Sequence, residues 1–320
     1  MGAFIKHRRL NRLAILAALL LGGCATVPAA DAPKLAITID DLPVHGPIPE
    51  GMTALEVNRQ MIRAITDARV PGATVFVNGH WTETNPETSA ALQAWSDAGI
   101  PVANHSWSHK SLDAVSADAF KEEITRNEPV LERYSGGRDW RWFRFPFLHE
   151  GVDPAKRAEI RTFLADRNYR IASVSMDFAD WKFTAPYARC KAARNDAAIA
   201  EMERLYLAAV RDNVDYSRTL GRAVYGREIP QVLLMHVGAF SAHMMPKVIA
   251  EYRKAGFRFV SLAEAQADPA YAEDNDPRLS ARPQYLSARA VAMGIPLPHI
   301  ADPEAALAGL CPGGPLASRP

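Results

Sequence analysis

Short apolar runs alternate with stretches of helical periodicity from residue 34 onward. The runs are rich in β-branched and aromatic side chains, which is typical of strands. They are KLAITI (34–39), ATVFVN (73–78), IPVAN (100–104), WRWFRF (140–145), RIASVS (170–175), QVLLMHV (231–237) and FRFVSL (257–262). Between them the spacing of apolar residues predicts helices over 53–69, 85–99, 116–133, 154–167, 195–211 and 244–255.

Local signals mark where several of these helices begin and end. Thr53 and Glu56 have the spacing of a capping box at the start of the first helix. The second helix has Asn85 as its cap, Pro86 at its first position and Gly99 as its stop. Repeated strand–helix units of this kind indicate an α/β fold with a parallel sheet, either an (α/β) barrel or a distorted version of one.

The N-terminus differs from the rest of the chain. Basic residues precede a short apolar run, Leu13–Leu21, which is too short for an ordinary transmembrane helix. The following LGGC resembles a bacterial lipoprotein box, in which Cys24 would be lipidated. This predicts a lipoprotein signal peptide over 1–23 and a tether over 24–33; a plain signal peptide cut elsewhere is the alternative.

Charge and cysteine content narrow the class of protein. The 37 Lys and Arg residues nearly balance the 36 Asp and Glu residues, and no basic run occurs outside the N-terminus, so a nucleic-acid partner is not indicated. Besides Cys24 the chain has Cys190 and Cys311, which an exported protein could pair. Their separation along the chain leaves that pairing open.

Polar residues gather at the carboxyl ends of five predicted strands, which in α/β barrels is the face where active sites form. They are Asp40, Asp41, His105, His109, Arg144, Asp177, Asp180 and His236.

The residue types at these positions suit a hydrolytic metal site. Such a site needs a few nitrogen and oxygen ligands and an open position for water. His105 and His109 can present both imidazoles to one point, and Asp41 can complete the set. Asp40 would then stay free to take a proton from water. A regular strand would point the two aspartates to opposite faces, so this arrangement requires a bend at Asp41, which Pro43 makes plausible.

Each of these residues also has a simpler interpretation. The two histidines could be a solvated loop pair, and the two aspartates could cap a turn. Arg144 could be part of an ordinary surface ion pair, and His236 a core histidine. Four further histidines in loops near this rim are possible substrate contacts: His45, His80, His149 and His243.

Five segments, taken in order, resemble the motifs of the polysaccharide deacetylase family, the NodB-homology carbohydrate esterases. They are ITIDDLP, HSWSH, RFPF, DFADW and LLMH, which together span residues 37–236. The resemblance implies a distorted (β/α) barrel of the NodB-homology type, a zinc-type Asp-His-His site and removal of N- or O-acetyl groups from sugars.

The resemblance also implies a role for each matching residue. Asp40 becomes the general base and His236 the general acid, with Arg144 holding Asp40 and Asp180 tuning His236. The metal ligands are Asp41, His105 and His109, with Zn²⁺ as the favoured divalent metal. The substrate-binding residues are Phe147, whose backbone N–H would help bind the oxyanion, Trp181 and Leu234.

Some positions depart from the family pattern. Ile39 stands where Phe is usual, Leu42 where Gly is frequent and Phe147 where Tyr is common. The segment between Trp181 and His236 is longer than the family pattern leads us to expect. We therefore divide the chain into a polysaccharide deacetylase-like catalytic domain over 34–265, with a helical insertion over 185–229, and a loose C-terminal extension over 266–320.

The sequence thus leads to one functional hypothesis with two alternatives. The hypothesis is a metal-dependent hydrolase, acting on carbon–nitrogen bonds other than peptide bonds, that deacetylates a glycan or amino-sugar derivative. It would be exported to the periplasmic side of a bacterial membrane and lipid-anchored through Cys24, with the outer membrane favoured over the inner. One alternative is an amidohydrolase of the same fold acting on a non-sugar amide; the other is a non-catalytic carbohydrate-binding lipoprotein.

Overall fold

The structure is a computed structural model that describes residues 1–2, 32–279 and 285–312. The chain divides into two compact units, Met1–Asp31 and Ala32–Pro320, and the fold below is that of the second unit. The predicted signal peptide and the lipidation site Cys24 lie outside the described residues, as does the tether up to residue 31.

A parallel sheet forms the centre of the described chain. Its strands run in the order β5-β4-β3-β2-β1-β7-β6, and β8 pairs with β1. The strands are β1 (Lys34–Leu42), β2 (Thr74–Val77), β3 (Val102–Asn104), β4 (Trp142–Phe143), β5 (Arg170–Ile171), β6 (Met176–Asp177), β7 (Gln231–His236) and β8 (Arg258–Phe259).

The sheet curls almost into a ring. Its two edge strands, β5 and β6, are joined by residues 172–175 alone, which can span at most about 14 Å. This link also bonds to strands on both sides, since Ala172 N–H donates to the carbonyl of Phe143 and Ser175 N–H donates to that of Val232. The predicted distorted α/β barrel is therefore confirmed.

The same link explains why one predicted strand is shorter in the structure than the sequence indicated. RIASVS was expected to form one strand over 170–175, but only Arg170 and Ile171 pair with β4, and pairing with β7 resumes at Met176. A segment that crosses from one edge of a curled sheet to the other cannot stay in register with a single neighbour.

β1 lies in the middle of the sheet, and its sequence suits that position. Every residue from Leu35 to Asp40 is buried, as is expected of a strand covered on both faces. Its register with β7 places Asp40 opposite His236. Two of the predicted site residues, far apart in the sequence, are therefore neighbours on adjacent strands.

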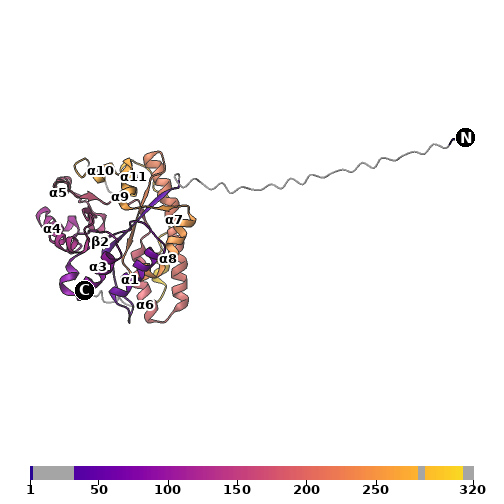
Figure 1. Ribbon diagram of the computed structural model, residues 1–320, viewed down its shortest axis with the longest axis horizontal. Helices are drawn as coiled ribbons and strands as arrows, with labels where there is room; N and C mark the ends of the chain where they lie inside the picture. Colours follow the sequence, from indigo (N-terminus) through magenta and orange to yellow (C-terminus); the bar gives the residue numbers. More distant parts are fainter. Residues whose placement is uncertain (3–31, 280–284, 313–320) are drawn as a thin grey trace. The chain divides into compact units, whose positions relative to one another are not determined.

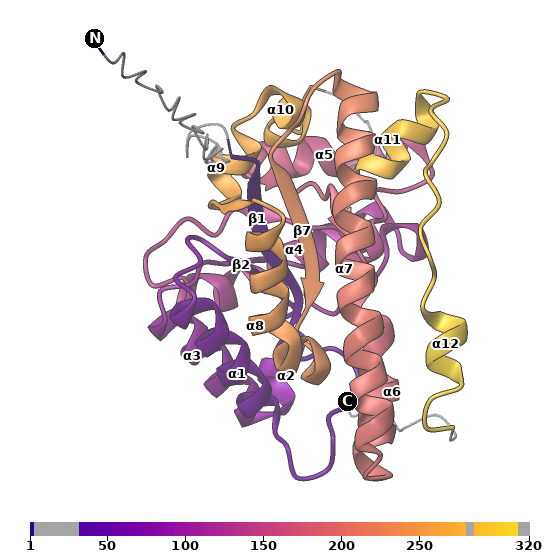
Figure 2. The same ribbon diagram turned by 90° about the vertical axis from the view of Figure 1, so that its right-hand side faces the viewer.

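Helices cover the outside of the barrel. Figure 1 shows α4 and α5 on one side and α7 and α8 on the other, and Figure 2 shows α8 lying alongside β1 and β7 with α7 next to it. The α-helices are α1 (Ala54–Asp67), α2 (His80–Thr84), α3 (Pro86–Asp97), α4 (Ala117–Tyr134), α5 (Pro154–Asp166), α6 (Thr184–Ala192), α7 (Asp196–Tyr225), α8 (Ala239–Lys254), α9 (Leu262–Gln266), α10 (Ala272–Asn275), α11 (Leu286–Ala292) and α12 (Glu304–Ala308). Short 3₁₀ turns occupy Leu112–Ala114, Pro146–Leu148, Asp180–Phe183 and Pro269–Tyr271.

Two helices are longer than their sequence patterns predicted. α7 was expected to end near residue 211 but continues to Tyr225, because Val214 still packs in the main core and Leu220 packs against Leu286 of the C-terminal segment. It ends where Gly226 adopts a φ of 70°, a conformation that glycine accepts without steric cost. α8 was expected to start near residue 244 but begins at Ala239, directly after the extended residue Gly238.

The described parts of the chain after residue 266, 267–279 and 285–312, pack against the rest of the fold, so the expectation of a loose extension does not hold for them. Leu307 is buried, and a disulfide joins Cys190 of α6 to Cys311 with 5.2 Å between their Cα atoms. Arg289 of α11 forms a buried ion pair with Asp274 of α10. The segment is rich in Pro, Ala and Asp, and its sequence showed no sign of these contacts because they come from single side chains.

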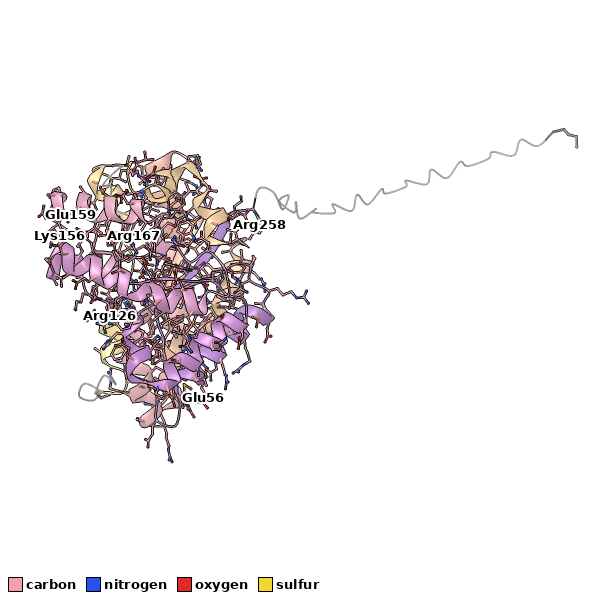
Figure 3. The ribbon with its side chains drawn as sticks, turned by 60° about the vertical axis from the view of Figure 1, so that its left-hand side comes forward. Glu56, Arg126, Lys156, Glu159, Arg167 and Arg258 are labelled. Atoms are coloured by element: carbon pink, nitrogen blue, oxygen red, sulfur yellow. A yellow bond between two sulfur atoms is a disulfide. The ribbon has the colours of Figure 1, made fainter. Side chains whose placement is uncertain are left out.

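Charged side chains lie on the outer surfaces of the helices. Figure 3 shows Glu56 of α1, Arg126 of α4 and Glu159 of α5, and all three are exposed. Within the described residues, no helix combines the length and the apolar character that a membrane span requires.

Candidate active site

β1 ends in two aspartates that turn toward one cavity. Asp41 has a φ of 64°, and the pairing of β1 with β2 shifts register between Ile39 and Leu42. The predicted bend at Asp41 is therefore present. Because of it, Asp40 and Asp41 both line the same cavity at the carboxyl end of the sheet.

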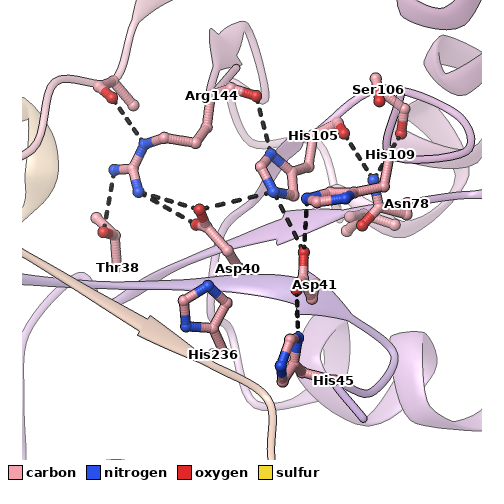
Figure 4. A network of polar contacts seen from close by, with 12 residues as sticks. Thr38, Asp40, Asp41, His45, Asn78, His105, Ser106, His109, Arg144 and His236 are labelled. Atoms are coloured by element: carbon pink, nitrogen blue, oxygen red, sulfur yellow. Dashed lines mark hydrogen bonds and ion pairs between the residues drawn. The ribbon is translucent and has the colours of Figure 1, made fainter. Parts of the chain in front are cut away.

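The two histidines of HSWSH meet Asp41 through a turned loop rather than a helix. His105 directly follows β3, and positive φ values at Ser106 (66°) and His109 (57°) fold the loop back on itself. The centroids of the two imidazole rings lie 4.9 Å apart. Possible ligand atoms of Asp41, His105 and His109 all lie within 4.8 Å of one another (Figure 4).

The proton positions at this cluster favour a bound cation. His105 Nδ1 lies 2.8 Å from the carbonyl oxygen of Arg144, and since a carbonyl only accepts, Nδ1 carries the proton. In the neutral imidazole the lone pair of Nε2 then faces Asp41 Oδ1 at 3.3 Å. His109 Nε2 lies 3.2 Å from the same oxygen, which is buried and has no hydrogen-bond partner among the described residues.

The pKa directions agree with a neutral His109 beside an ionised Asp41. Burial is the main cause that lowers the pKa of His109 to about 4. Burial alone would raise the pKa of Asp41, but the close approach of His105 and the hydrogen bond with His45 outweigh it and hold that pKa well below its usual range. One divalent cation would satisfy all three groups at once.

Arg144 holds the other aspartate. Its Nη1 lies 3.2 and 3.3 Å from the two carboxylate oxygens of Asp40. Its Nε donates to the carbonyl of Ala172 at 2.7 Å, and its Nη2 donates to Thr38 Oγ1 at 3.0 Å. The guanidinium is fully buried, so the alternative of a surface ion pair is wrong. Burial lowers the pKa of Arg144, and the charge of Asp40 opposes that shift.

His236 is oriented by a buried carboxylate. Its Nδ1 donates to Asp180 Oδ1 at 2.7 Å, and its backbone N–H donates to Oδ2 of the same residue at 2.9 Å. Ser241 Oγ donates to Oδ2 at 2.6 Å, which fixes the carboxylate in turn. Burial lowers the pKa of His236, but the charge and hydrogen bond of Asp180 outweigh it and raise this pKa to about 10. This shift favours the imidazolium form of His236, in which Nε2–H is free of Asp180.

These groups surround a cavity of about 350 Å³. Phe147 and Trp181 are 58% and 44% exposed, so they form its rim and are not core residues. Arg144 and Asp180 stand behind the wall, each holding a residue that faces the cavity. The residues that line it are Asp40, Asp41, His45, His105, His109, Phe147, Leu148, Asp177, Trp181, Leu234 and His236.

Three lining residues were not among the predicted catalytic, metal-ligating or acyl-pocket residues. Among the four additional histidines, His45 lines the cavity and lies 2.7 Å from Asp41 Oδ2 through its Nδ1. Asp177 was identified only by its place at a strand end, and Leu148 was not identified at all. The one local signal for Leu148 is its position after RFPF, where both Phe147 and Leu148 adopt positive φ values near 58°.

The other three histidines have partners elsewhere. His243 pairs with Glu203 at 2.6 Å on the outer surface. His149 contacts Ser111 at 3.1 Å, and the His80 ring packs edge-on against Trp81.

The chain was compared with known protein families and with curated proteins. The family model described as polysaccharide deacetylase matches residues 28–163. An uncharacterized 30.6 kDa protein from the region 3′ of fumA in Geobacillus stearothermophilus is 30% identical over 112 residues, which is 34% of this chain and 38% of that protein. A peptidoglycan-N-acetylglucosamine deacetylase of Bacillus cereus is 26% identical over 149 residues, 47% of this chain and 46% of that protein. The chain thus spans less than half the length of these relatives.

A solved structure gives the same view of the fold. A mutant of BA3943 from Bacillus anthracis, described as a CE4 family pseudoenzyme, matches with a TM-score of 0.52 at 17% identity, over 73% of this chain and 67% of that chain. At this identity the likeness shows the fold alone. The family match ends before DFADW and LLMH, so the placement of Asp180 and His236 at the same cavity as the Asp-His-His group rests on the geometry of this chain.

Proposed function

Because residues 28–163 match the polysaccharide deacetylase family model, we propose that this chain is a metal-dependent hydrolase that removes acetyl groups from a glycan or amino-sugar derivative. One observation carries the proposal. An Asp-His-His cluster, an Arg-held aspartate and an Asp-held histidine all face one cavity. A metal ligand set, a base and an acid are the groups that amide hydrolysis requires.

The residues present fit a divalent metal. The buried oxygen Asp41 Oδ1, without a hydrogen-bond partner among the described residues, and two imidazole nitrogens form a small mixed N/O set, which suits Zn²⁺ and leaves positions for water and substrate. When bound by Asp41, His105 and His109, the metal would supply Lewis acidity toward the acetyl carbonyl and make water more acidic.

Asp40 is the proposed general base. Arg144 keeps its carboxylate oriented, and the carboxylate lies beside His105, with Asp40 Oδ2 3.7 Å from His105 Nε2. Asp40 would take a proton from the water that adds to the acetyl carbon. General-base catalysis of this kind contributes about 10²–10⁴ in rate.

His236 is the proposed general acid. Its Nδ1–H is committed to Asp180, so the proton available to a leaving group is the one on Nε2. An amine leaves poorly unless it is protonated, and His236 would donate as the carbon–nitrogen bond breaks. The products are acetate and the free amine.

The walls of the cavity complete the proposal. Trp181 and Leu234 would surround the acetyl methyl group, and the backbone N–H near Phe147 would donate to the developing oxyanion. Phe147 has a positive φ value. Non-glycine residues keep such a conformation only where the surrounding structure enforces it, and they are frequent at active sites.

The alternatives differ in what they leave unexplained. A relative of the same fold carries the description pseudoenzyme, so the fold by itself does not decide for catalysis. A protein that only binds carbohydrate would have no use for the buried supports of Asp40 and His236. An amidohydrolase acting on a non-sugar amide would use the same chemistry, so the substrate panel below separates it from a glycan deacetylase.

The decisive experiment is acetate release from peptidoglycan, chitooligosaccharide and acetylated xylan by purified, metal-loaded protein. We expect release from at least one substrate, and loss of about 10²–10⁴ in rate in Asp40→Asn with metal content unchanged. Acetate release only from simple amides would favour the non-sugar alternative. An inactive wild type that still binds these glycans would favour the binding protein.

We also propose that the protein is exported and lipid-anchored. The pair Cys190–Cys311 supports export, because disulfides persist in oxidising compartments outside the cytosol. We assign the signal peptide to 1–23, the lipid to Cys24 and the catalytic domain to 34–265. Mass spectrometry of the membrane fraction should find Cys24 lipidated, and an unmodified N-terminus in the soluble fraction would contradict the assignment.

A further inference from the structure

His45 lies between two groups of the catalytic proposal and has no part in it. Its Nδ1 is 2.7 Å from Asp41 Oδ2, and its ring centroid is 5.0 Å from that of His236. Figure 4 shows His45 on the opposite side of Asp41 from His105 and His109. The cavity therefore contains a partly buried histidine that contacts a proposed metal ligand from outside the Asp-His-His cluster.

The two carboxylate oxygens of Asp41 face different partners. A carboxylate that binds a cation is ionised and only accepts hydrogen bonds, so the proton in the contact with Oδ2 is on His45 Nδ1. The other oxygen, Oδ1, has no hydrogen-bond partner among the described residues, and it lies 3.3 Å from His105 Nε2 and 3.2 Å from His109 Nε2. The hydrogen bond thus occupies one oxygen and leaves the other facing the two imidazole nitrogens.

The position of His45 does not depend on Asp41 alone, because other elements hold the loop after β1. The backbone N–H of His45 donates to the carbonyl of Val237, directly after β7, at 2.6 Å. The carbonyl of Pro43 accepts a hydrogen bond from Asn58 Nδ2 of α1 at 2.7 Å, and Asn58 is fully buried. The imidazole therefore reaches Asp41 from a fixed backbone, which a group that orients another side chain requires.

The same arrangement occurs at one of the other proposed ligands. The Nδ1 of His105 is held by the carbonyl of Arg144 at 2.8 Å, which leaves Nε2 for the metal position. His105 and Asp41 thus each have a hydrogen bond at the atom that points away from the cluster. Hydrogen bonds of this kind fix the orientation of metal ligands. A carboxylate that is free to rotate could bring both oxygens to a metal ion, whereas the bond from His45 restricts Asp41 to Oδ1.

We propose that His45 is a positioning residue for the metal ligand Asp41. By holding Oδ2 it presents Oδ1 alone, so that one carboxylate oxygen and two imidazole nitrogens face the metal position, a ligand set that suits Zn²⁺ with an open position for water. This role rests on the proposed function and adds to it the residue that sets how Asp41 binds the metal. His45 itself is not one of the three described residues whose possible ligand atoms lie within 4.8 Å of one another.

The zinc affinity of the metal-free protein, measured by competition with a chromophoric chelator, tests this role without any substrate. His45→Leu removes the donor at similar size and should lower the affinity about 10–100-fold. In His45→Asn the side-chain N–H can take the place of Nδ1–H, so this variant should regain most of the affinity. His243→Leu is the matched control with wild-type affinity expected, because His243 pairs with Glu203 on the outer surface.

The visible spectrum of the Co²⁺-loaded protein gives a second readout. Tetrahedral Co²⁺ absorbs visible light much more strongly than octahedral Co²⁺ does. His45→Leu frees Oδ2 to bind the metal as well and so raises the number of ligand atoms. Its absorption should therefore be weaker than that of the wild type and of His45→Asn.

Equal zinc affinity and equal spectra in His45→Leu and the wild type would overturn the role of His45. Equal losses of affinity in His45→Leu and His45→Asn would also contradict it, because they would make the imidazole itself a ligand. Circular dichroism of the metal-free variants should match that of the wild type. If His45→Leu does not fold, the comparison of His45→Ala with His45→Asn decides in its place.

Failure of the proposed function gives a different result, since none of these readouts uses turnover. A wild type that binds zinc but releases no acetate would count against the hydrolase alone, and the variants would still decide the role of His45. A wild type that binds neither metal would overturn both proposals.

Discussion

The two aspartates at the end of β1 show how position alone separates the parts played by identical side chains. Asp40 keeps the regular direction of the strand and meets the buried guanidinium of Arg144. Asp41 has left the strand direction through its positive φ and meets two imidazoles and His45. The first environment orients a carboxylate beside a guanidinium, and the second places a carboxylate beside two imidazoles, as the proposed metal site requires.

His109→Ala should lower the metal content of the purified protein measured by elemental analysis after dialysis. Mutation of a residue that only supports a metal ligand lowers metal affinity by about 10–100-fold. Loss of a ligand itself should therefore lower the affinity by more than about 100-fold. His243→Ala is the control, because His243 lies on the surface with Glu203. Full occupancy in His109→Ala would remove this residue from the ligand set.

Asp180→Asn should change how activity depends on pH. The pKa of His236 is raised to about 10 by Asp180, and without that charge it should fall toward the ordinary value of about 6.5. Since the acid must be protonated, kcat/KM should decline from a lower pH in the variant. The alkaline limb of the pH profile measures this, and histidine NMR titration gives a readout independent of turnover.

Ser241→Ala provides the comparison for Asp180→Asn. It removes one hydrogen bond to the same carboxylate but leaves its charge, so the alkaline limb should move much less. An alkaline limb that stays in place in Asp180→Asn would show that His236 does not act as the acid.

At the scale of elements, α6, α7 and the C-terminal segment work as one assembly. The disulfide fixes the end of the chain to α6, and Lys182 pairs with Asp302 at 2.9 Å near the rim residue Trp181. Figure 2 shows α12 alongside α6 and α11 alongside α7. Within this assembly α7 and the C-terminal segment form one side of a cavity of about 200 Å³ that is lined by Asn213 and Tyr285, although none of the residues of the assembly lies in the family match.

The double variant Cys190→Ser/Cys311→Ser should lose about 2–5 kcal/mol of unfolding free energy, because the disulfide restricts the unfolded chain over a sequence separation of 121 residues. Urea unfolding measures the loss. Reduction with dithiothreitol should destabilise the wild type similarly and leave the double variant unaffected. Equal stability of wild type and variant without reductant would contradict the pairing.

For the whole molecule, a buried ionic cluster links the barrel to the C-terminal segment. Glu150 and Arg161 pair at 3.4 Å, and Arg161 also donates to the carbonyls of Glu273 and Pro277. Burial is the largest influence on Glu150 and raises its pKa to about 7, although the charge of Arg161 opposes the shift.

This shift makes stability depend on pH. The folded state binds the Glu150 proton more tightly than the unfolded state does. The stabilisation of the fold that comes from this protonation is complete below the ordinary carboxyl pKa of about 4.5, and it is lost as pH rises through about 7. The glutamine in Glu150→Gln cannot ionise, so the variant does not lose stability in this way as pH rises. Its unfolding free energy relative to wild type should therefore rise by roughly 2–3 kcal/mol between pH 4.5 and pH 8.

Urea unfolding of both proteins, freed of metal with a chelator, measures this difference at several pH values. The other ionisable groups are shared, so their contributions cancel in the comparison. A difference in stability that does not vary with pH would show that Glu150 has an ordinary pKa.

Local features were predictable because local interactions produce them. The capping box of Thr53 and Glu56, the cap at Asn85 and the buried run of β1 each depend on a few consecutive residues, and the structure contains all three. The order of strands and helices then indicated a distorted barrel, and the strand ends identified the groups that line the cavity.

The sequence by itself therefore determined the α/β class, the barrel and the residue types of the site, because periodicity and capping act over a turn or a strand. Tertiary structure alone decided which distant groups meet. Arg144 reaches Asp40 across 104 positions, and Cys190 meets Cys311 across 121. It also decided that α7 and the C-terminal segment enclose a second cavity, since no short-range pattern specifies how separate elements pack around a common space.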